Sequence, residues 1–488
     1  MSNLDQKAWE TIDSVTASLV DFSGEGINYG EISRWFLWDK VGRYYRKTFC
    51  PDDFAFEVEC LRRFEKHQSH AIWRVKLRLL ANLIKNRCQK KIRTEYKRPP
   101  VREGGKLVFV PFPDERIRGI AEIVINERHT LATNIQSILP EFVDATVVTG
   151  DCEKAISSHL STQIHTVLNQ RLKALGVILE PDDRGKLYRQ IVQQQRLLAQ
   201  ADAEISAIQP DLIFLHGDNH SPYQEYAAVA TKYGVPTMTF QHGLDCERYY
   251  LDHAYSSHYG VWSQTRCDQY RAVNPARPKC LQVTGNPKYD ALSYPESINT
   301  EGDFWLWITR PHKPKYCYAP TRRPSEGVEI FRALISALGK NPTEKLLVKP
   351  HPNDFAEIYR ELAVKSDCAN RIVITDEKLD RLIPLAKLII SEDSSAGVET
   401  MFSGKLVIHT HFAESAPVLK LTDFGAALPG FSPAQLSDSI DQASRLSLRD
   451  RQRMLIGQCE CLDYYAGPLD GLSSHRQKKF ILDTLNGL

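Results

Sequence analysis

Short, continuous apolar runs separated by helical segments dominate the chain from residue 106 onward. Such runs lack the apolar–polar alternation of a half-exposed strand and are typical of parallel strands that are buried on both faces. They form two successive groups, which are 106–112, 145–150, 211–218, 236–243, 260–263 and 280–287, and then 304–310, 345–352, 371–376, 387–395 and 405–412. This rhythm predicts an α/β protein with two doubly wound, Rossmann-like domains.

The first hundred residues follow a different pattern, with apolar residues at helical spacing, as in 71–84. A basic run then holds Lys90, Lys91, Arg93, Lys97 and Arg98, and the sequence Pro99-Pro100 and Gly104-Gly105 follows as a linker. The predicted organisation is a helical N-terminal extension and linker over 1–103, a first Rossmann-like domain over 104–295, a second over 296–455, and a C-terminal helix crossing back to the first domain over 456–488.

Composition narrows the functional classes. The chain has 488 residues, of which 42% are apolar and 25% charged, as in folded globular proteins. Its 62 Lys and Arg against 60 Asp and Glu give a net charge of +2, so bulk charge offers no reason to expect nucleic-acid binding. An anionic ligand must therefore be held by a few local groups.

Cysteine usage and the apolar stretches indicate the compartment. The eleven cysteines lack the regular spacing of a disulfide scaffold, which favours a reducing environment. The first residues, MSNLDQKAWETIDS, lack the apolar core of a secretory signal, and the apolar runs are too short for a membrane helix. We expect a cytoplasmic protein. The basic run is either a solvated helix end or a contact with an anionic lipid or glycan surface, such as the cytoplasmic face of the inner membrane.

Polar residues follow the strands of the first predicted domain, where ligands bind in open parallel sheets. Asp218 follows a buried strand and could act as general base or nucleophile, or could simply form the turn. Asp114, Glu115 and Glu127 are alternative carboxylates. Asp218 and His242 are the predicted catalytic residues, and the predicted acceptor or cleft residues are His216, Asn219, His220, Gln241 and Asn286.

The second predicted domain carries groups that suit a phosphate. Arg310 and Lys349 follow two strands, and His351 lies between two prolines that fix its backbone. Ser394 and Ser395 precede a short helix, whose free N–H groups attract anions. The predicted donor-nucleotide and phosphate ligands are Arg310, Lys349, His351, Ser394, Ser395 and Glu399. A plain serine cap, a structural His–Pro turn and a solvated glutamate are the simpler readings.

Several cofactor fingerprints are absent from the sequence. It contains no G-x-G-x-x-G after a strand, no P-loop and no H-E-x-x-H motif. Cys459 and Cys461 have no second pair for a zinc site, and His409 and His411 are interpreted as structural. We therefore expect no metal and no cofactor.

The order of the strand-end motifs resembles that of GT-B glycosyltransferases of bacterial surface polysaccharide synthesis, which build capsule and lipopolysaccharide. The motifs are DLIFLHGDN, GVPTMTFQHG, VTGNPKYD, LLVKPHPND and IISEDSSAGVETMFSGK. The resemblance covers residue 106 to the C-terminus and is greatest to the retaining β-Kdo transferases that use CMP-Kdo. Bacterial sialyltransferases and CDP-glycerol glycerophosphotransferases are more distantly similar.

This resemblance implies the GT-B fold and a role for each motif. His351, Ser394 and Ser395 would hold the nucleotide phosphate, Glu399 would contact the ribose, and Asp218 would be the nucleophile or base. The implied function is the transfer of Kdo from CMP-Kdo onto a growing capsule or O-antigen glycan. Its partners would be the nucleotide-sugar donor, a glycan or glycolipid acceptor and other polysaccharide-assembly proteins.

Three alternatives stay open at the level of sequence. The chain could be a CDP-glycerol-type polyol-phosphate transferase, or a non-catalytic glycan-binding or assembly subunit with the same fold. A non-hydrolysing sugar-nucleotide epimerase would also share the fold. Donor, linkage and stereochemical outcome depend on pocket shape, which sequence motifs do not define.

Overall fold

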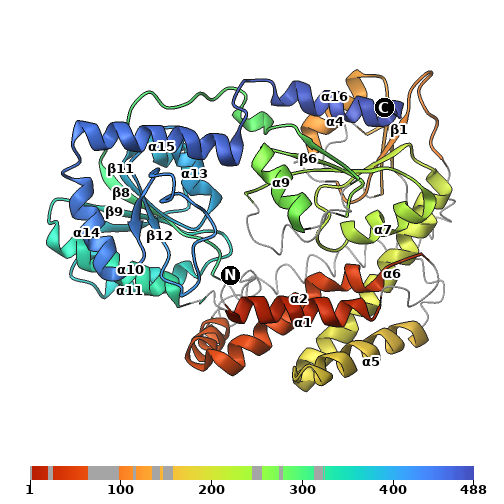
Figure 1. Cartoon of the computed structure of the whole chain (residues 1–488), viewed down its shortest axis with the longest axis horizontal. Helices are drawn as coiled ribbons and strands as arrows, with labels where there is room; N and C mark the ends of the chain where they lie inside the picture. Colours follow the sequence, from red (N-terminus) through yellow and green to blue (C-terminus); the bar gives the residue numbers. More distant parts are fainter. Residues whose placement is uncertain are drawn as a thin grey trace, which may run out of the picture.

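Two parallel sheets, each in its own domain, organise the molecule (Figure 1). The computed structural model describes residues 3–19, 26–63, 98–113, 117–134, 143–146, 158–244, 255–273, 279–312, 323 and 325–487. Asp114 and Glu115 lie outside the described residues, as does most of the basic run that ends at Arg98.

The first sheet has seven parallel strands in the order β3-β2-β1-β4-β5-β6-β7. These are β1 (Leu107–Val110), β2 (Thr130–Thr133), β3 (Ala145–Thr146), β4 (Leu212–Phe214), β5 (Thr237–Phe240), β6 (His258–Val261) and β7 (Cys280–Val283). The chain reverses its direction of winding between β1 and β4, which is where a doubly wound sheet opens a ligand crevice.

The second sheet has six parallel strands in the order β10-β9-β8-β11-β12-β13. These are β8 (Phe304–Ile308), β9 (Leu346–Lys349), β10 (Ile372–Ile374), β11 (Ala386–Glu392), β12 (Val407–Thr410) and β13 (Leu428–Gly430). Its switch point lies between β8 and β11. The predicted fold class, an α/β protein of the GT-B kind with two doubly wound domains and a helical N-terminal extension, is confirmed.

Helices cover both faces of the first sheet, as its continuous apolar strands require. Val108 and Val110 of β1 pack against α4 (Arg118–Asn126) and α16 (Ser473–Asn486), whereas Leu107 and Phe109 face the opposite core. That opposite core contains α7 (Tyr223–Tyr233), α5 (Ser158–Ala174) and α6 (Pro181–Ile208).

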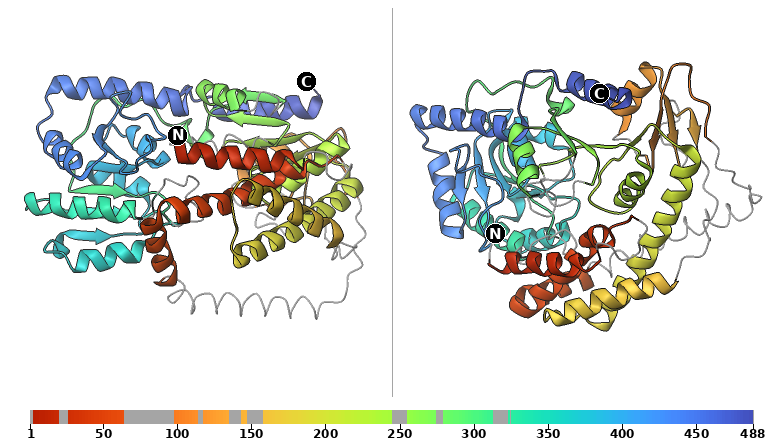
Figure 2. Two further views of the ribbon diagram at one scale, coloured as in Figure 1. Left: turned by 60° about the horizontal axis from the view of Figure 1, so that its bottom comes forward. Right: turned by 45° about the vertical axis from the view of Figure 1, so that its right-hand side comes forward.

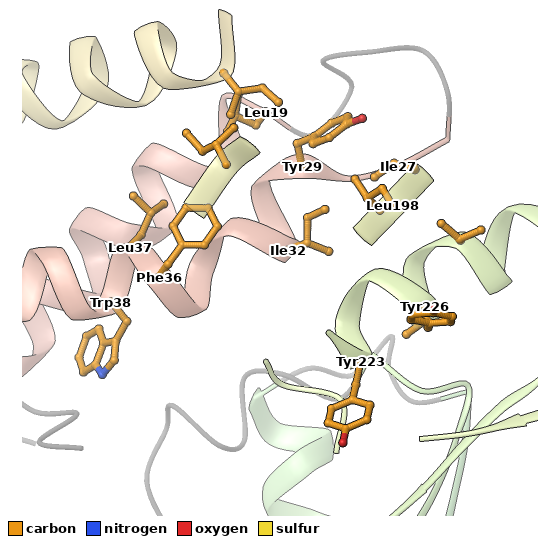
Figure 3. Close-up of a cluster of buried hydrophobic side chains, with 14 of the residues drawn as sticks. Leu19, Ile27, Tyr29, Ile32, Phe36, Leu37, Trp38, Leu198, Tyr223 and Tyr226 are labelled. Carbon is orange, nitrogen blue, oxygen red and sulfur yellow. The ribbon is translucent and has the colours of Figure 1, made fainter. Parts of the chain in front are cut away.

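The N-terminal helices belong to this same core. Side chains of α1 (Asn3–Ala17) and α2 (Tyr29–Phe49) join those of α6 and α7 in one buried cluster, part of which is drawn in Figure 3. Gln194 and Gln224 both donate to the Ile32 carbonyl, at 2.6 and 2.8 Å. In both views of Figure 2 these red helices lie beside α5 and α6. The extension is thus an integral layer of the first domain.

The same extension also reaches the second domain. Residues 51–63 are helical, and Ser325 donates to Asp53 at 2.5 Å. Phe56 packs against the core of the second domain, and Arg63 pairs with Glu361 at 3.4 Å. The extension therefore bridges the two domains.

The helices of the second domain surround its sheet in the same way. They include α10 (Glu326–Lys340), α11 (Ala356–Val364), α12 (Leu379–Leu382), α13 (Ser395–Met401), α14 (Pro433–Ala443) and α15 (Leu448–Ala466). The chain then returns through α16, so that the blue helices at the top of Figure 1 lie on both domains. In the described part of the chain, no helix has the length and hydropathy that crossing a membrane requires.

Candidate active site

The carboxyl ends of β8, β9 and β11 bring the predicted phosphate ligands to one edge of the second sheet. Ile308 is aligned with Lys349 on one side and with Ser391 on the other. The residues that follow these three positions therefore leave the sheet side by side. His351, Arg310 and Ser394 are among them.

His351 is held as a hydrogen-bond donor at this edge. Its Nδ1 accepts from the Asn353 backbone N–H at 3.0 Å, so the ring proton resides on Nε2. Its own backbone N–H donates to Thr309 Oγ1 at 2.9 Å, which fixes the Pro–His–Pro turn against β8. The ring is half-buried. This tautomer gives the ring one hydrogen-bond donor, Nε2–H.

Lys349 and the start of α13 lie near this imidazole. The Lys349 side chain is half-buried and, within the described residues, its ammonium pairs with no carboxylate. Ser394 caps α13 by accepting from the Ala396 N–H at 3.4 Å, and both Ser394 and Ser395 are half-buried. These hydroxyls, the backbone N–H groups at the start of α13 and the Lys349 ammonium thus belong to neighbouring strand ends.

Arg310, which the sequence predicts to bind phosphate, is buried in a network of ion pairs. Its side chain is only 2% exposed, and its guanidinium donates to Glu326 and lies 3.6 Å from Glu392. Two carboxylates therefore balance its charge inside the domain. The reason is tertiary: two carboxylates that are distant in sequence converge on it.

A buried ionic cluster surrounds Arg310, and sequence reasoning did not find it. The cluster consists of Arg310, His312, Glu326 and Glu392, and His312 Nε2 lies 2.6 Å from Glu392 Oε2. Burial alone would lower the pKa of His312, but the carboxylates of Glu392 and Asp354 raise it above its ordinary value. Burial opposes ionisation of Glu326, yet Arg310 and the nearby histidines keep the pKa of that carboxyl below its usual range.

His409 and His411 adjoin this cluster, and both reach the carboxylate of Asp393, at 3.5 and 3.8 Å. They lie on one face of β12 and its extension. The sequence does place two carboxylates, Glu392 and Asp393, at the end of β11. A carboxylate at a strand end can face either solvent or the interior, so the sequence does not predict its burial. Among the described residues, no set of three or more histidine, cysteine or acidic side chains is arranged to hold a metal ion.

Three predicted residues of the first domain form a histidine cluster, defined as His216, His220 and His242. A methyl group on Gly217 would lie 3.2 Å from the His220 ring and 3.9 Å from the His242 ring, so both rings cover this glycine. The rings of His216 and His242 are 5.6 Å apart. His220 Nδ1 lies 2.9 Å from Asn219 Oδ1, and His242 is exposed.

Asp218 belongs to the same turn, but its carboxylate is enclosed. It is 3% exposed, and its Oδ2 accepts from the Ser256 backbone N–H at 2.8 Å. Burial raises its pKa to about 7, although the hydrogen bonds from residues 255 and 256 oppose that rise. In this conformation the Asp218 carboxylate is therefore covered by the backbone of residues 255 and 256. The alternative Glu127 pairs with Lys478 at 2.5 Å.

Gln241 and Asn286 have structural partners. Gln241 accepts from the Trp262 N–H at 2.9 Å and donates to the Gly243 carbonyl at 2.7 Å. Asn286 accepts from the Lys288 N–H at 3.1 Å and thereby caps a short 3₁₀ turn. Gln241 nevertheless lines a narrow crevice of about 10 Å³, together with Tyr464 and Tyr465 of α15.

Glu399 joins the two domains. On α13 of the second domain, it accepts from Lys288 Nζ and from Tyr289 Oη of the first domain, each at 3.0 Å. The Tyr289 ring also lies 4.9 Å from the ring of Phe402. The helix that begins at the Ser394–Ser395 pair is therefore the helix that contacts the first domain. A ribose bound by Glu399 would have to share this carboxylate with Tyr289.

Removing the Tyr289 hydroxyl tests this joint. The variant Tyr289→Phe is expected to lower the free energy of unfolding by about 1 kcal/mol, because a hydrogen bond from a buried phenol to a carboxylate is lost. The matched variant Lys288→Ala removes a 64%-exposed partner and should cost less than about 0.5 kcal/mol. Urea denaturation of both variants measures the difference, and equal losses would contradict this ranking.

The known proteins that this chain is similar to are solved structures of low sequence identity. No family model and no curated protein sequence matches the chain. Similar solved structures include Staphylococcus aureus MnaA with UDP (14% identity, covering 78% of this chain and 98% of that one, TM-score 0.48). A trehalose-phosphate synthase from Burkholderia vietnamiensis is 13% identical, with 78% of this chain and 98% of that one covered and a TM-score of 0.46. A glycosyltransferase from Rickettsia africae is 13% identical, with 78% of this chain and 99% of that one covered and a TM-score of 0.42. Similarities of this size do not indicate a substrate.

Proposed function

We propose that this chain is a metal-independent glycosyltransferase that transfers a sugar from a CMP-linked donor, with Kdo as the sugar, onto a bacterial surface glycan. One observation carries the proposal. The Lys349 ammonium, the His351 imidazole and the Ser394–Ser395 start of α13 all belong to segments at the carboxyl ends of β9 and β11. Since β9 and β11 both flank β8, these groups span roughly 10 Å, which suits a phosphate and its attached sugar.

The charge at this edge favours a single phosphate. Glu326 and Glu392 neutralise Arg310. Among the predicted phosphate ligands, Lys349 therefore supplies the positive charge. The phosphodiester of a CMP-linked sugar carries one charge, whereas the diphosphate of UDP-linked and CDP-linked donors carries two; the carboxylate of Kdo is a separate charge on the sugar. One ammonium, one imidazole N–H and a capped helix start are sufficient for the smaller charge. The departing phosphate is then stabilised by these residues themselves.

The first domain would hold the acceptor over the histidine cluster. We assign the catalytic roles to Asp218 and His242, which follow neighbouring strands. A carboxyl with a pKa of about 7 is well suited to accept the proton of an acceptor hydroxyl as the sugar–oxygen bond forms and CMP departs. As a nucleophile it would instead form the sugar ester first. Either role requires the loop at 255–256 to uncover Asp218.

The first test is a binding measurement. In isothermal titration we expect CMP to bind the protein at least tenfold more tightly than UDP. The variant His351→Ala should weaken CMP binding by about tenfold to a hundredfold, the loss associated with a hydrogen bond to a charged group. His165→Ala is the matched control, because His165 is also half-buried but lies on α5 of the first domain. Tighter binding of UDP, or an unaltered His351→Ala variant, would contradict the proposal.

Turnover separates the remaining alternatives. Release of CMP from CMP-Kdo in the presence of a glycan acceptor supports the proposal. Transfer of glycerol phosphate from CDP-glycerol would instead identify a polyol-phosphate transferase, and isomerisation of a UDP-sugar without acceptor would identify an epimerase. A chain that binds glycan but releases no nucleotide from any of these donors is an assembly subunit.

A further inference from the structure

A second pocket lies at the opposite edge of the second sheet, where its strands begin. Its volume is about 150 Å³. Trp305 and Leu388, from the amino ends of β8 and β11, line it together with Leu406, which precedes β12. Ile440 and Ala443 from the end of α14 form another wall. Since the candidate active site occupies the carboxyl ends of the same strands, the two sites are separated by the length of the sheet.

The polar lining of this pocket carries one unmatched charge. Lys387 and Glu344 neutralise each other through an ion pair of 2.6 Å. Arg451, on the first turns of α15, also lines the pocket, and its Nε is buried without a hydrogen-bond partner. Within the described residues its guanidinium makes no ion pair. The pocket therefore has a net positive charge beside an apolar wall.

We propose that this pocket binds a small organic monoanion, with a carboxylate on Arg451 and an apolar body against Trp305 and Leu388. A guanidinium offers parallel N–H groups that match the two oxygens of a carboxylate, and the buried Nε–H of Arg451 is costly to leave without an acceptor. An inorganic anion would have no apolar part to pack against the apolar wall. A cavity of roughly 150 Å³ holds benzene, so the body should have about six or seven carbons.

Benzoate is the probe that fits this description. We expect it to bind with a Kd of about 1 mM, as befits a ligand of so few atoms. Ligand-observed NMR and isothermal titration measure the affinity. Benzyl alcohol keeps the ring without the charge, and acetate keeps the charge without the ring. Both should bind at least tenfold more weakly than benzoate.

Two variants test the two halves of the site. Arg451→Gln should weaken benzoate binding at least tenfold, and Ala443→Leu, which fills the pocket, should do the same with Arg451 retained. Arg449→Gln, an exposed arginine on the same helix, is the matched control and should leave the affinity unchanged. Circular dichroism and the melting temperature show that each variant is folded.

Two results would contradict the proposed binding of an organic monoanion. Absence of benzoate binding at 20 mM would overturn the proposal. Equal affinities of the wild-type and Arg451→Gln proteins would do so as well. CMP binding should be the same in Arg451→Gln and wild-type protein, because the phosphate edge lies at the other end of the strands. This inference is therefore tested independently of the proposed transferase activity.

Discussion

Replacing Arg310 with methionine is expected to lower the free energy of unfolding of the second domain by about 3–5 kcal/mol. The substitution keeps most of the apolar volume but leaves Glu326 without its cation and Glu392 with His312 alone. Both carboxylates are about 1% exposed, so water cannot take the place of the guanidinium. Breaking one side of a buried ion pair therefore costs far more than the pair itself contributes.

Urea denaturation followed by tryptophan fluorescence measures this loss, because Trp305 and Trp307 are buried in the second domain. Arg381→Met is the matched control: Arg381 is 71% exposed and pairs with Glu377 at 3.4 Å. That variant should change the free energy of unfolding by less than about 0.5 kcal/mol. If Arg310→Met behaved like Arg381→Met, the charges of the buried cluster would not be coupled as their geometry indicates.

A triple variant distinguishes lost charge pairing from lost packing. Glu326→Gln and Glu392→Gln, combined with Arg310→Met, remove every full charge that Arg310 contacts. After Glu326→Gln, the side-chain amide oxygen could still accept from the Phe412 and Ala413 N–H groups, which Glu326 binds at 2.7 and 3.1 Å. We expect the triple variant to recover most of the stability. A triple variant as unstable as Arg310→Met would assign the loss to packing.

The strands were predictable because a parallel sheet covered by helices imposes continuous apolar runs. Two strands escaped this criterion. β2 has the sequence TLAT, with threonines at both ends, and β13 is the edge strand LPG, whose proline tolerates pairing on one side only. Both pair with a neighbour through backbone groups that apolar pattern does not report. Short strands with few apolar residues are thus the part of the topology that the apolar pattern does not predict.

The strand-end rule located the candidate site but not the state of each charge. It placed Lys349, His351 and Ser394 at one edge, because parallel strands end together. It did not reveal that Arg310 pairs with Glu326 and Glu392, because tertiary structure brings these carboxylates to it. Asp218 shows the same difficulty, because its cover is the backbone of Ser256, 38 residues later in the chain.

The role of the N-terminal helices was also beyond the sequence pattern. Helical spacing predicts that a helix has an apolar face but does not identify what covers it. In the structure, Trp9 of α1 and Trp38 of α2 stack at 4.3 Å, and the surrounding cluster continues into α6 and α7 (Figure 3). Through Asp53 and Arg63 the same segment reaches the second domain. The extension therefore stabilises the arrangement of the two domains as well as one core.

Raising the pH from 4 to 7 is expected to weaken folding through Asp218. Burial raises the folded-state pKa of this carboxyl to about 7 from its ordinary value of 3.8. Between these values the unfolded chain has released the proton and the folded chain still holds it, so the stability falls as the pH rises. The total effect of a shift of about three units is on the order of 4 kcal/mol, and it is complete above pH 7.

Asp218→Asn removes this titration while its amide oxygen can still accept from the Ser256 N–H. The variant should therefore gain stability relative to the wild-type protein as the pH rises, by a few kcal/mol between pH 5 and pH 8. Glu225, whose pKa burial also raises to about 7, contributes the same trend to both proteins and cancels in the comparison. Urea denaturation at the two pH values measures the difference, with the exposed Asp202→Asn as control. A constant difference would mean that Asp218 is ionised throughout this range, and its candidacy as a base near neutral pH would then lose its physical ground.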